Sequence, residues 1–216
     1  MNKIKTIWIN SYIYRVINVM MNNFYRNKLK NSDFTILCSN CVGGCIYHRL
    51  GKEFLSPTIN LYFEQPDFVQ FLLHLDYYCD EELLFIESDR SYPVATLGGG
   101  KFRQIFLYFV HYKSEAEARN KWNERKNRIN KNNLYIIMYN IQGITEKELH
   151  MLDNYPCQNK VLLNWKEMPE ISWSVHVDPG KKNDYLAKNI WGKRQYERQW
   201  DFVGFLNTRR DAYEAR

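Results

Sequence analysis

The sequence predicts an α/β fold with three layers, in which helices cover both faces of a parallel or mixed sheet. Short, continuous apolar runs such as 34–38, 105–110 and 134–139 are typical of strands that are buried on both faces. Segments with helical spacing lie between these runs, as in sheets that are covered by helices. The 216 residues, 45% hydrophobic and 25% charged, have the size and composition of an ordinary globular domain.

The N-terminus forms a basic segment of its own. Residues 1–31 contain six Lys and Arg side chains and no Asp or Glu. Polar residues such as Asn10, Arg15 and Asn18 interrupt its apolar character, so we predict neither a secretory leader nor a membrane-spanning helix. We expect 1–31 to be a basic amphipathic helical segment and 32–216 to be a single α/β domain. The segment either docks on the domain, which is the simpler interpretation, or lies on an anionic membrane surface.

The predicted strands are short apolar runs rich in β-branched and aromatic residues. In chain order they are 34–38, 58–63, 83–86, 105–110, 134–139, 161–163 and 173–177. The run 105–110 is the strongest, and we expect it near the centre of the sheet.

The predicted helices have apolar residues three and four positions apart. They are 45–50, 66–75, 114–130, 145–154 and 198–207. Ser114 and Thr145 are typical N-cap residues, and Ser114 is followed three residues later by Glu117. Gly51 ends the first of these helices.

Charge and cysteine content limit the class of partner and the compartment. The formal charge of +6 permits an anionic partner. However, the basic residues of the helix 114–130 alternate with Glu, as on a solvated helix face, so a nucleic-acid partner is not expected. Aromatic residues make up 16% of the chain, and we assign most of them to the core. Five cysteines, an odd number, predict a reduced, cytoplasmic protein.

Two loops after predicted strands are candidate sites, because ligands bind at strand ends in open α/β sheets. In the first, Asn40 to Gly44, the small residues Gly43 and Gly44 allow a close approach to an anion at a helix start. The alternative is a glycine turn needed only for packing. Cys41 in this loop is a candidate thiol nucleophile whose pKa the helix start would lower. The second loop places His111 where it could transfer protons, or bond only to nearby backbone.

Residue types that can bind metal ions are concentrated at two places in the sequence. The run Cys38-x-x-Cys41-x-x-x-Cys45-x-x-His48 lacks a second ligand pair elsewhere, and its members divide between a buried strand and a helix. The acidic triplet at 87–89 is short, and we interpret it as a solvated turn. We therefore predict no metal site.

These loops and several later positions resemble an uncharacterised bacterial family, domain of unknown function 1919, whose members are described as exopolysaccharide biosynthesis proteins. The resemblance rests on Asn40-Cys41-x-Gly43-Gly44, Leu50-Gly51, Phe54 to Leu61, Tyr92-Pro93-Val94, His111-Tyr112-x-Ser114, Glu117-Ala118, Lys121-Trp122, Arg125, Arg128-Ile129-Asn130 and Asn159-Lys160-Val161. It covers residues 33 to 207 and leaves the basic N-terminal segment outside. It implies a role in surface-polysaccharide synthesis and no particular reaction.

We expect a transferase that moves a glycosyl, acyl or phospho-alditol group onto a sugar or polysaccharide precursor, near the inner face of the cytoplasmic membrane. The expected catalytic residues are His111 and Cys41. The expected substrate-binding residues are Asn40, Gly43, Gly44, Asn60, Tyr92, Tyr112 and Arg125. No cofactor is identified, and an activated, nucleotide-linked donor is one option. The alternative is a non-enzymatic glycan- or protein-binding assembly factor of the same pathway.

Overall fold

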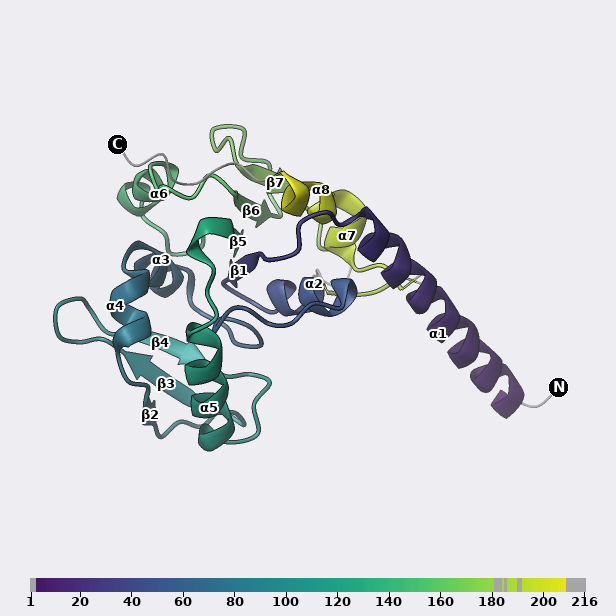
Figure 1. Cartoon of the computed structure of the whole chain (residues 1–216), viewed down its shortest axis with the longest axis horizontal. Helices are drawn as coiled ribbons and strands as arrows, with labels where there is room; N and C mark the ends of the chain where they lie inside the picture. The colour runs from purple at the N-terminus through teal and green to yellow at the C-terminus, as the bar shows by residue number, and fades with distance from the viewer. Residues whose placement is uncertain (1–2, 181–183, 185, 190–191, 209–216) are drawn as a thin grey trace.

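The computed structural model describes residues 3–180, 184, 186–189 and 192–208. Among these residues, four strands form a parallel sheet in the order β1-β5-β6-β7 (Figure 1). They are β1 (Thr35–Cys38), β5 (Leu134–Tyr139), β6 (Lys160–Asn164) and β7 (Ser174–His176), and a 3₁₀ helix (Lys131–Asn133) precedes β5. The predicted α/β class is confirmed.

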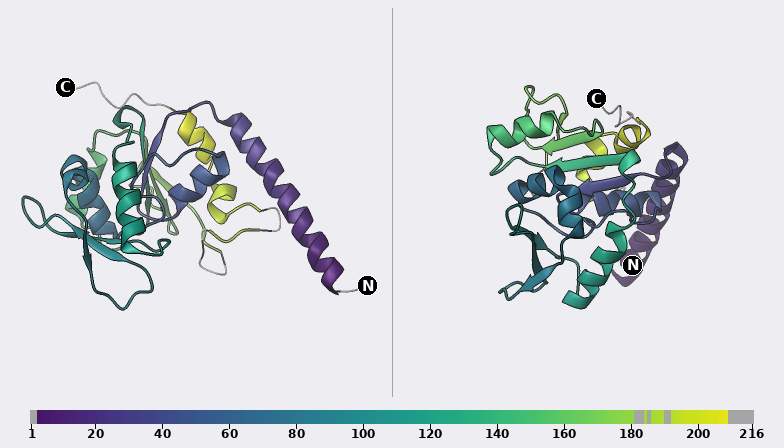
Figure 2. Two further views of the ribbon diagram at one scale, coloured as in Figure 1. Left: turned by 60° about the horizontal axis from the view of Figure 1, so that its bottom comes forward. Right: turned by 60° about the vertical axis from the view of Figure 1, so that its left-hand side comes forward.

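Helices cover both faces of this sheet, which explains why its strands are continuous apolar runs (Figure 2). Along β5, Ile136 and Met138 belong to one core, whereas Tyr135 and Ile137 belong to the other. The first core is covered by α3 (Gln65–Leu73), α4 (Leu75–Asp80), α5 (Glu115–Lys126) and α6 (Glu146–Asp153), and the second by α1 (Lys3–Lys28), α2 (Val42–Leu50), α7 (Gln195–Gln199) and α8 (Phe202–Asn207).

A second, antiparallel sheet has the order β2-β3-β4. Its strands are β2 (Leu84–Ile86), β3 (Val94–Leu97) and β4 (Ile105–Tyr108). The prediction that 105–110 is central in the main sheet is therefore wrong. Gly98 and Gly99, with φ of +80° and +101°, help to turn the chain so that β3 and β4 pair as a hairpin. Ile105 is buried and Phe106 is exposed, so this apolar run is covered on one face only.

The prediction of a strand at 58–63 is also wrong. Asn60 has a left-handed φ of 65°, which interrupts an extended chain, and an isolated bridge pairs Tyr62 with Tyr108. The segment nevertheless borders β1, because the Thr58 hydroxyl accepts a hydrogen bond of 3.0 Å from the last amide of that strand. It thus connects the edge of the parallel sheet to the antiparallel sheet.

Side-chain caps define several helix ends. Ser114 and Thr145 each accept a hydrogen bond from the backbone amide three residues further on, as predicted. The single helix predicted over 198–207 is instead two helices. The Asp201 side chain caps the second one by accepting a hydrogen bond of 3.0 Å from the Gly204 amide.

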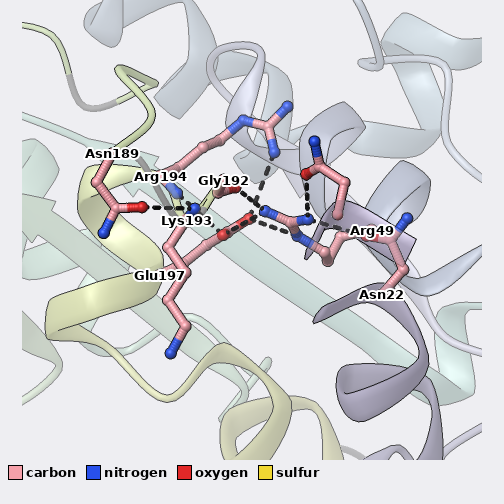
Figure 3. A network of polar contacts seen from close by, with 8 residues as sticks. Asn22, Arg49, Asn189, Gly192, Lys193, Arg194 and Glu197 are labelled. Atoms are coloured by element: carbon pink, nitrogen blue, oxygen red, sulfur yellow. Dashed lines mark hydrogen bonds and ion pairs between the residues drawn. The ribbon is translucent and has the colours of Figure 1, made fainter. Parts of the chain in front are cut away.

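A buried ion pair joins three helices (Figure 3). Arg49, near the end of α2, donates to both carboxylate oxygens of Glu197 on α7, at 3.0 and 2.6 Å. Its guanidinium also donates to the side chains of Asn18 and Asn22 on α1, at 3.3 and 2.9 Å, and to the Gly192 carbonyl at 2.6 Å. The Arg49 and Glu197 side chains are 3% and 0% exposed, so water cannot solvate either charge if its partner is removed.

The C-terminal part of α1 docks on the domain, while the rest of the helix extends away from it (Figure 1). Tyr25 is buried against Phe202, with ring centroids 4.9 Å apart. In the part of the chain that the structure describes, no helix combines the length and the apolar character that crossing a bilayer requires.

Substitution of the buried carboxylate tests this arrangement. Because Glu197→Gln leaves the Arg49 charge buried without its partner, we expect the free energy of unfolding to fall by about 3–5 kcal/mol in urea denaturation. Glu124→Gln, which removes exposed ion pairs on α5, is the matched control and should leave the denaturation midpoint unchanged. Equal effects of the two variants would contradict the role given to the buried pair.

Candidate active site

Cys41 lies between β1 and α2, at the N-cap position of the helix. The preceding residue, Asn40, stabilises this turn with its side chain. Its Oδ1 accepts a hydrogen bond of 2.9 Å from the Val42 amide and one of 3.4 Å from the Cys38 thiol. Asn40 therefore positions the loop, and it does not line the pocket described below.

The two glycines of the loop allow α2 to pack closely. A Cβ at Gly43 would lie 2.9 Å from the Cys38 Cβ, and one at Gly44 would lie 2.8 Å from the Asn60 Oδ1. Both distances are too short for a side chain. Gly44 borders the pocket, whereas Gly43 is buried beneath it. The helix starts at Val42, earlier than predicted, so both glycines belong to its first turn.

His111 follows β4 in a short turn and brings its imidazole to the Cys41 thiol. The distance between His111 Nε2 and Cys41 Sγ is 3.1 Å, which allows a hydrogen bond. The two residues are 70 positions apart in the chain. They meet because the 58–63 segment joins the end of β1 to β4, through its hydrogen bonds with Tyr108.

Tyr112 and Arg125 hold the backbone of the 58–63 segment behind the contact between Cys41 and His111. The Tyr112 hydroxyl donates to the Ile59 carbonyl at 2.9 Å, and Arg125 donates to that hydroxyl at 2.7 Å. The Arg125 guanidinium also lies over the Phe54 ring, 4.9 Å from its centroid. Both Tyr112 and Arg125 are buried, so the structure places them behind the pocket as positioning residues and not among its walls.

One pocket of about 360 Å³ contains the thiol and the imidazole. Its walls come from α2, the 58–63 segment, the turn after β4 and the region before α7. The lining residues are Cys41, Gly44, Cys45, His48, Asn60, His111, Leu186 and Arg194. Tyr92, which we expected to bind substrate, lines a separate hollow with Lys113 and the acidic triplet 87–89.

The electrostatics of the pocket keep its thiols protonated. Burial, together with a smaller contribution from the neighbouring Cys45 thiol, raises the pKa of Cys41 to about 11. Burial also raises the pKa of Cys45. The prediction that the helix start lowers the pKa of Cys41 is wrong, because burial of the thiol dominates. At neutral pH the Cys41 thiol is thus protonated where it contacts His111 Nε2.

The cysteine-rich run does not gather as metal ligands. Within the described residues, no three His, Cys, Asp or Glu side chains are arranged to hold a metal ion. Cys38 is fully buried in β1, and burial raises the pKa of its thiol to about 12.

Four pocket residues were not expected from the sequence: Cys45, His48, Leu186 and Arg194. Cys45 and His48 follow Cys41 by four and seven residues, a spacing that places all three on one helix face, so a helix starting at Val42 would have predicted them. Arg194 is 153 positions from Cys41 (194 − 41), and no local sequence pattern predicts that it lies in the same pocket.

The fold and the pocket together define an α/β domain with a cysteine–histidine pair where a parallel and an antiparallel sheet meet. The chain matches the family described as "Domain of unknown function (DUF1919)" over residues 12–207, and it belongs to this family. An uncharacterized protein of Haemophilus influenzae is 33% identical over 203 residues, which is 92% of this chain and 96% of that protein. The family match starts within α1, so the expectation that the N-terminal segment lies outside the family is wrong for residues 12–31.

Alkylation with iodoacetamide tests the protonation of the Cys41 thiol. Because the thiolate is the reacting form and the pKa is raised to about 11, the rate constant at Cys41 should rise about tenfold per pH unit from about pH 7 to 10. Peptide mass spectrometry measures it, with buried Cys38 as the internal unreactive control. A rate that already levels off near neutral pH would contradict a protonated thiol.

Proposed function

We propose that the protein is an acyl transferase that modifies a hydroxyl group of a sugar precursor in exopolysaccharide or capsule biosynthesis. The 3.1 Å contact between Cys41 Sγ and His111 Nε2 carries the proposal, since a thiol beside an imidazole is how a cysteine nucleophile is activated. Of the three groups considered from the sequence, the acyl group is the one that a thiol carries as a thioester. The polysaccharide setting rests on the family resemblance, and the reaction takes place in the cytoplasm, at the inner face of the membrane.

Each half of the reaction moves one proton through His111. In the first half, His111 takes the thiol proton while Cys41 Sγ attacks the acyl carbon of an activated ester or thioester donor. The donor's leaving group departs with that proton, and a thioester remains on Cys41. In the second half, His111 takes the proton of the sugar hydroxyl, whose oxygen attacks the thioester. Cys41 then leaves and recovers the proton from His111.

Asn60 and Arg194 provide polar contacts in the same pocket. Asn60 lines the same pocket as Cys41 with its Oδ1 close to Gly44, and the Nδ2 of its side-chain amide can donate to the developing oxyanion. Arg194 lines the pocket and pairs with Glu197 at 3.4 Å, and its remaining N–H groups can donate to an anionic donor, including an activated, nucleotide-linked one. It takes the role that the sequence analysis gave to Arg125, whose guanidinium is buried behind the pocket.

Trapping the thioester tests the proposal. We expect full-length protein incubated with acetyl-CoA or p-nitrophenyl acetate to gain one acetyl group on Cys41, detected by intact and peptide mass spectrometry. Because His111 is the base, His111→Ala should slow the acetylation about 10²–10⁴-fold with little change in the thermal midpoint. Cys45→Ala is the matched control, since it removes a thiol of the same pocket and should keep the reaction.

Two outcomes would reject the acyl transferase. One is acetylation that does not depend on His111 or that occurs equally at Cys45. The other is glycan binding by a protein that no acyl donor labels, which would support the non-enzymatic assembly factor. Unfolding of His111→Ala would instead be detected by its thermal midpoint, and His111→Gln would then replace it.

A further inference from the structure

The outward side of α1 carries a line of apolar side chains, which we call the outer stripe. These residues recur every three or four positions along the described part of the helix, and each is at least 42% exposed. They are Tyr12, Ile13, Val16, Val19, Met20 and Phe24. The N-terminal part of α1 extends beyond the body of the domain (Figures 1 and 2).

The α1 helix has apolar side chains both on the side that docks on the domain and on the outward side. Asn18 and Asn22 face the domain, where both accept hydrogen bonds from the buried Arg49. Tyr25 fills the core on the same side. A surface helix of a globular domain normally buries its apolar side and leaves polar residues in water. Here the contact with the domain uses Tyr25 and Met21 together with the two asparagines, and a further apolar surface is left outward, as in a helix with a second binding surface.

Charge indicates what the outer stripe contacts. Residues 1–31 contain six Lys and Arg side chains and no Asp or Glu. Of these cations, Arg15, Arg26, Lys28 and Lys30 are exposed, and Lys28 lies 4.0 Å from the Asp201 carboxylate of the domain. Apolar residues flanked by cations are the pattern of helices that lie at the surface of anionic bilayers. Paired copies of α1 would bring like charges together with no acidic residue of the segment to balance them, which disfavours a second copy.

We propose that α1 binds the surface of an anionic phospholipid bilayer, with the outer stripe inserted at the boundary between headgroups and acyl chains. Tyr12 and Phe24 are its aromatic members, and both are more than half exposed, at 70% and 51%. This binding would provide the membrane location that the proposed function includes, but it involves no residue of the Cys41 pocket, so the two proposals are tested separately.

Vesicle co-sedimentation of the full-length protein tests this surface. With vesicles of equal parts phosphatidylglycerol and phosphatidylcholine, we expect a partition coefficient at least tenfold higher than with phosphatidylcholine alone, and a loss of this difference at high salt. Arg15→Gln should lower binding to the anionic vesicles roughly fivefold, the usual effect of one basic residue near such a surface.

A double substitution separates the outer stripe from general hydrophobicity. Val16→Ser with Met20→Ser should lower binding at least tenfold and leave the circular dichroism spectrum unchanged, because both side chains are exposed. The matched control is Leu84→Ser with Ile86→Ser, which changes two exposed apolar residues on β2 and should bind like the unmodified protein. Cys41→Ala should also bind normally, so this proposal and the proposed function can fail separately.

Three results would overturn the proposal. They are equal binding to neutral and anionic vesicles, binding that the Val16→Ser and Met20→Ser pair does not weaken, and absence of vesicle binding. A dimer in sedimentation velocity that the same pair dissociates would identify a second copy of the chain as the occupant instead.

Discussion

The close packing of α2 against the turn at Ile59 and Asn60 is the constraint on which the candidate site depends. Gly43 and Gly44 leave no room for a side chain between the helix and its neighbours. This contact brings Asn60 to the wall beside Cys41. The same segment continues into the backbone bridge with Tyr108, so the turn after β4 is fixed at the other side of the thiol.

Much of the fold could be predicted from the sequence because local signals and burial agree there. The runs 34–38 and 134–139 are continuous and, apart from Thr35, composed of apolar and aromatic residues, and the structure buries both of their faces. The signal fails where a similar run has one exposed face, as in β4, because periodicity alone does not say which sheet a strand joins. It also fails at 58–63, where the left-handed conformation of Asn60 overrides an extended propensity.

The candidate site was predictable only in part. Cys41 and His111 could be chosen because each follows a strand, at the position where ligands bind in α/β sheets. Their contact could not be predicted, because it passes through the junction of two sheets. Arg125 was expected to bind substrate but is buried behind the pocket. Its guanidinium donates a hydrogen bond to the Tyr112 hydroxyl, a structural contact that a sequence pattern does not reveal. The raised pKa of Cys41 likewise follows from burial, which is a property of the assembled fold.

The shortness of α2 places the candidate site close to the buried ion pair. The helix has nine residues and is therefore about 13 Å long, with Cys41 at its N-cap and Arg49 in its last turn. The thiol that contacts His111 and the guanidinium that contacts Glu197 and Asn22 are thus carried at the two ends of one helix, so a displacement of α2 would change both contacts.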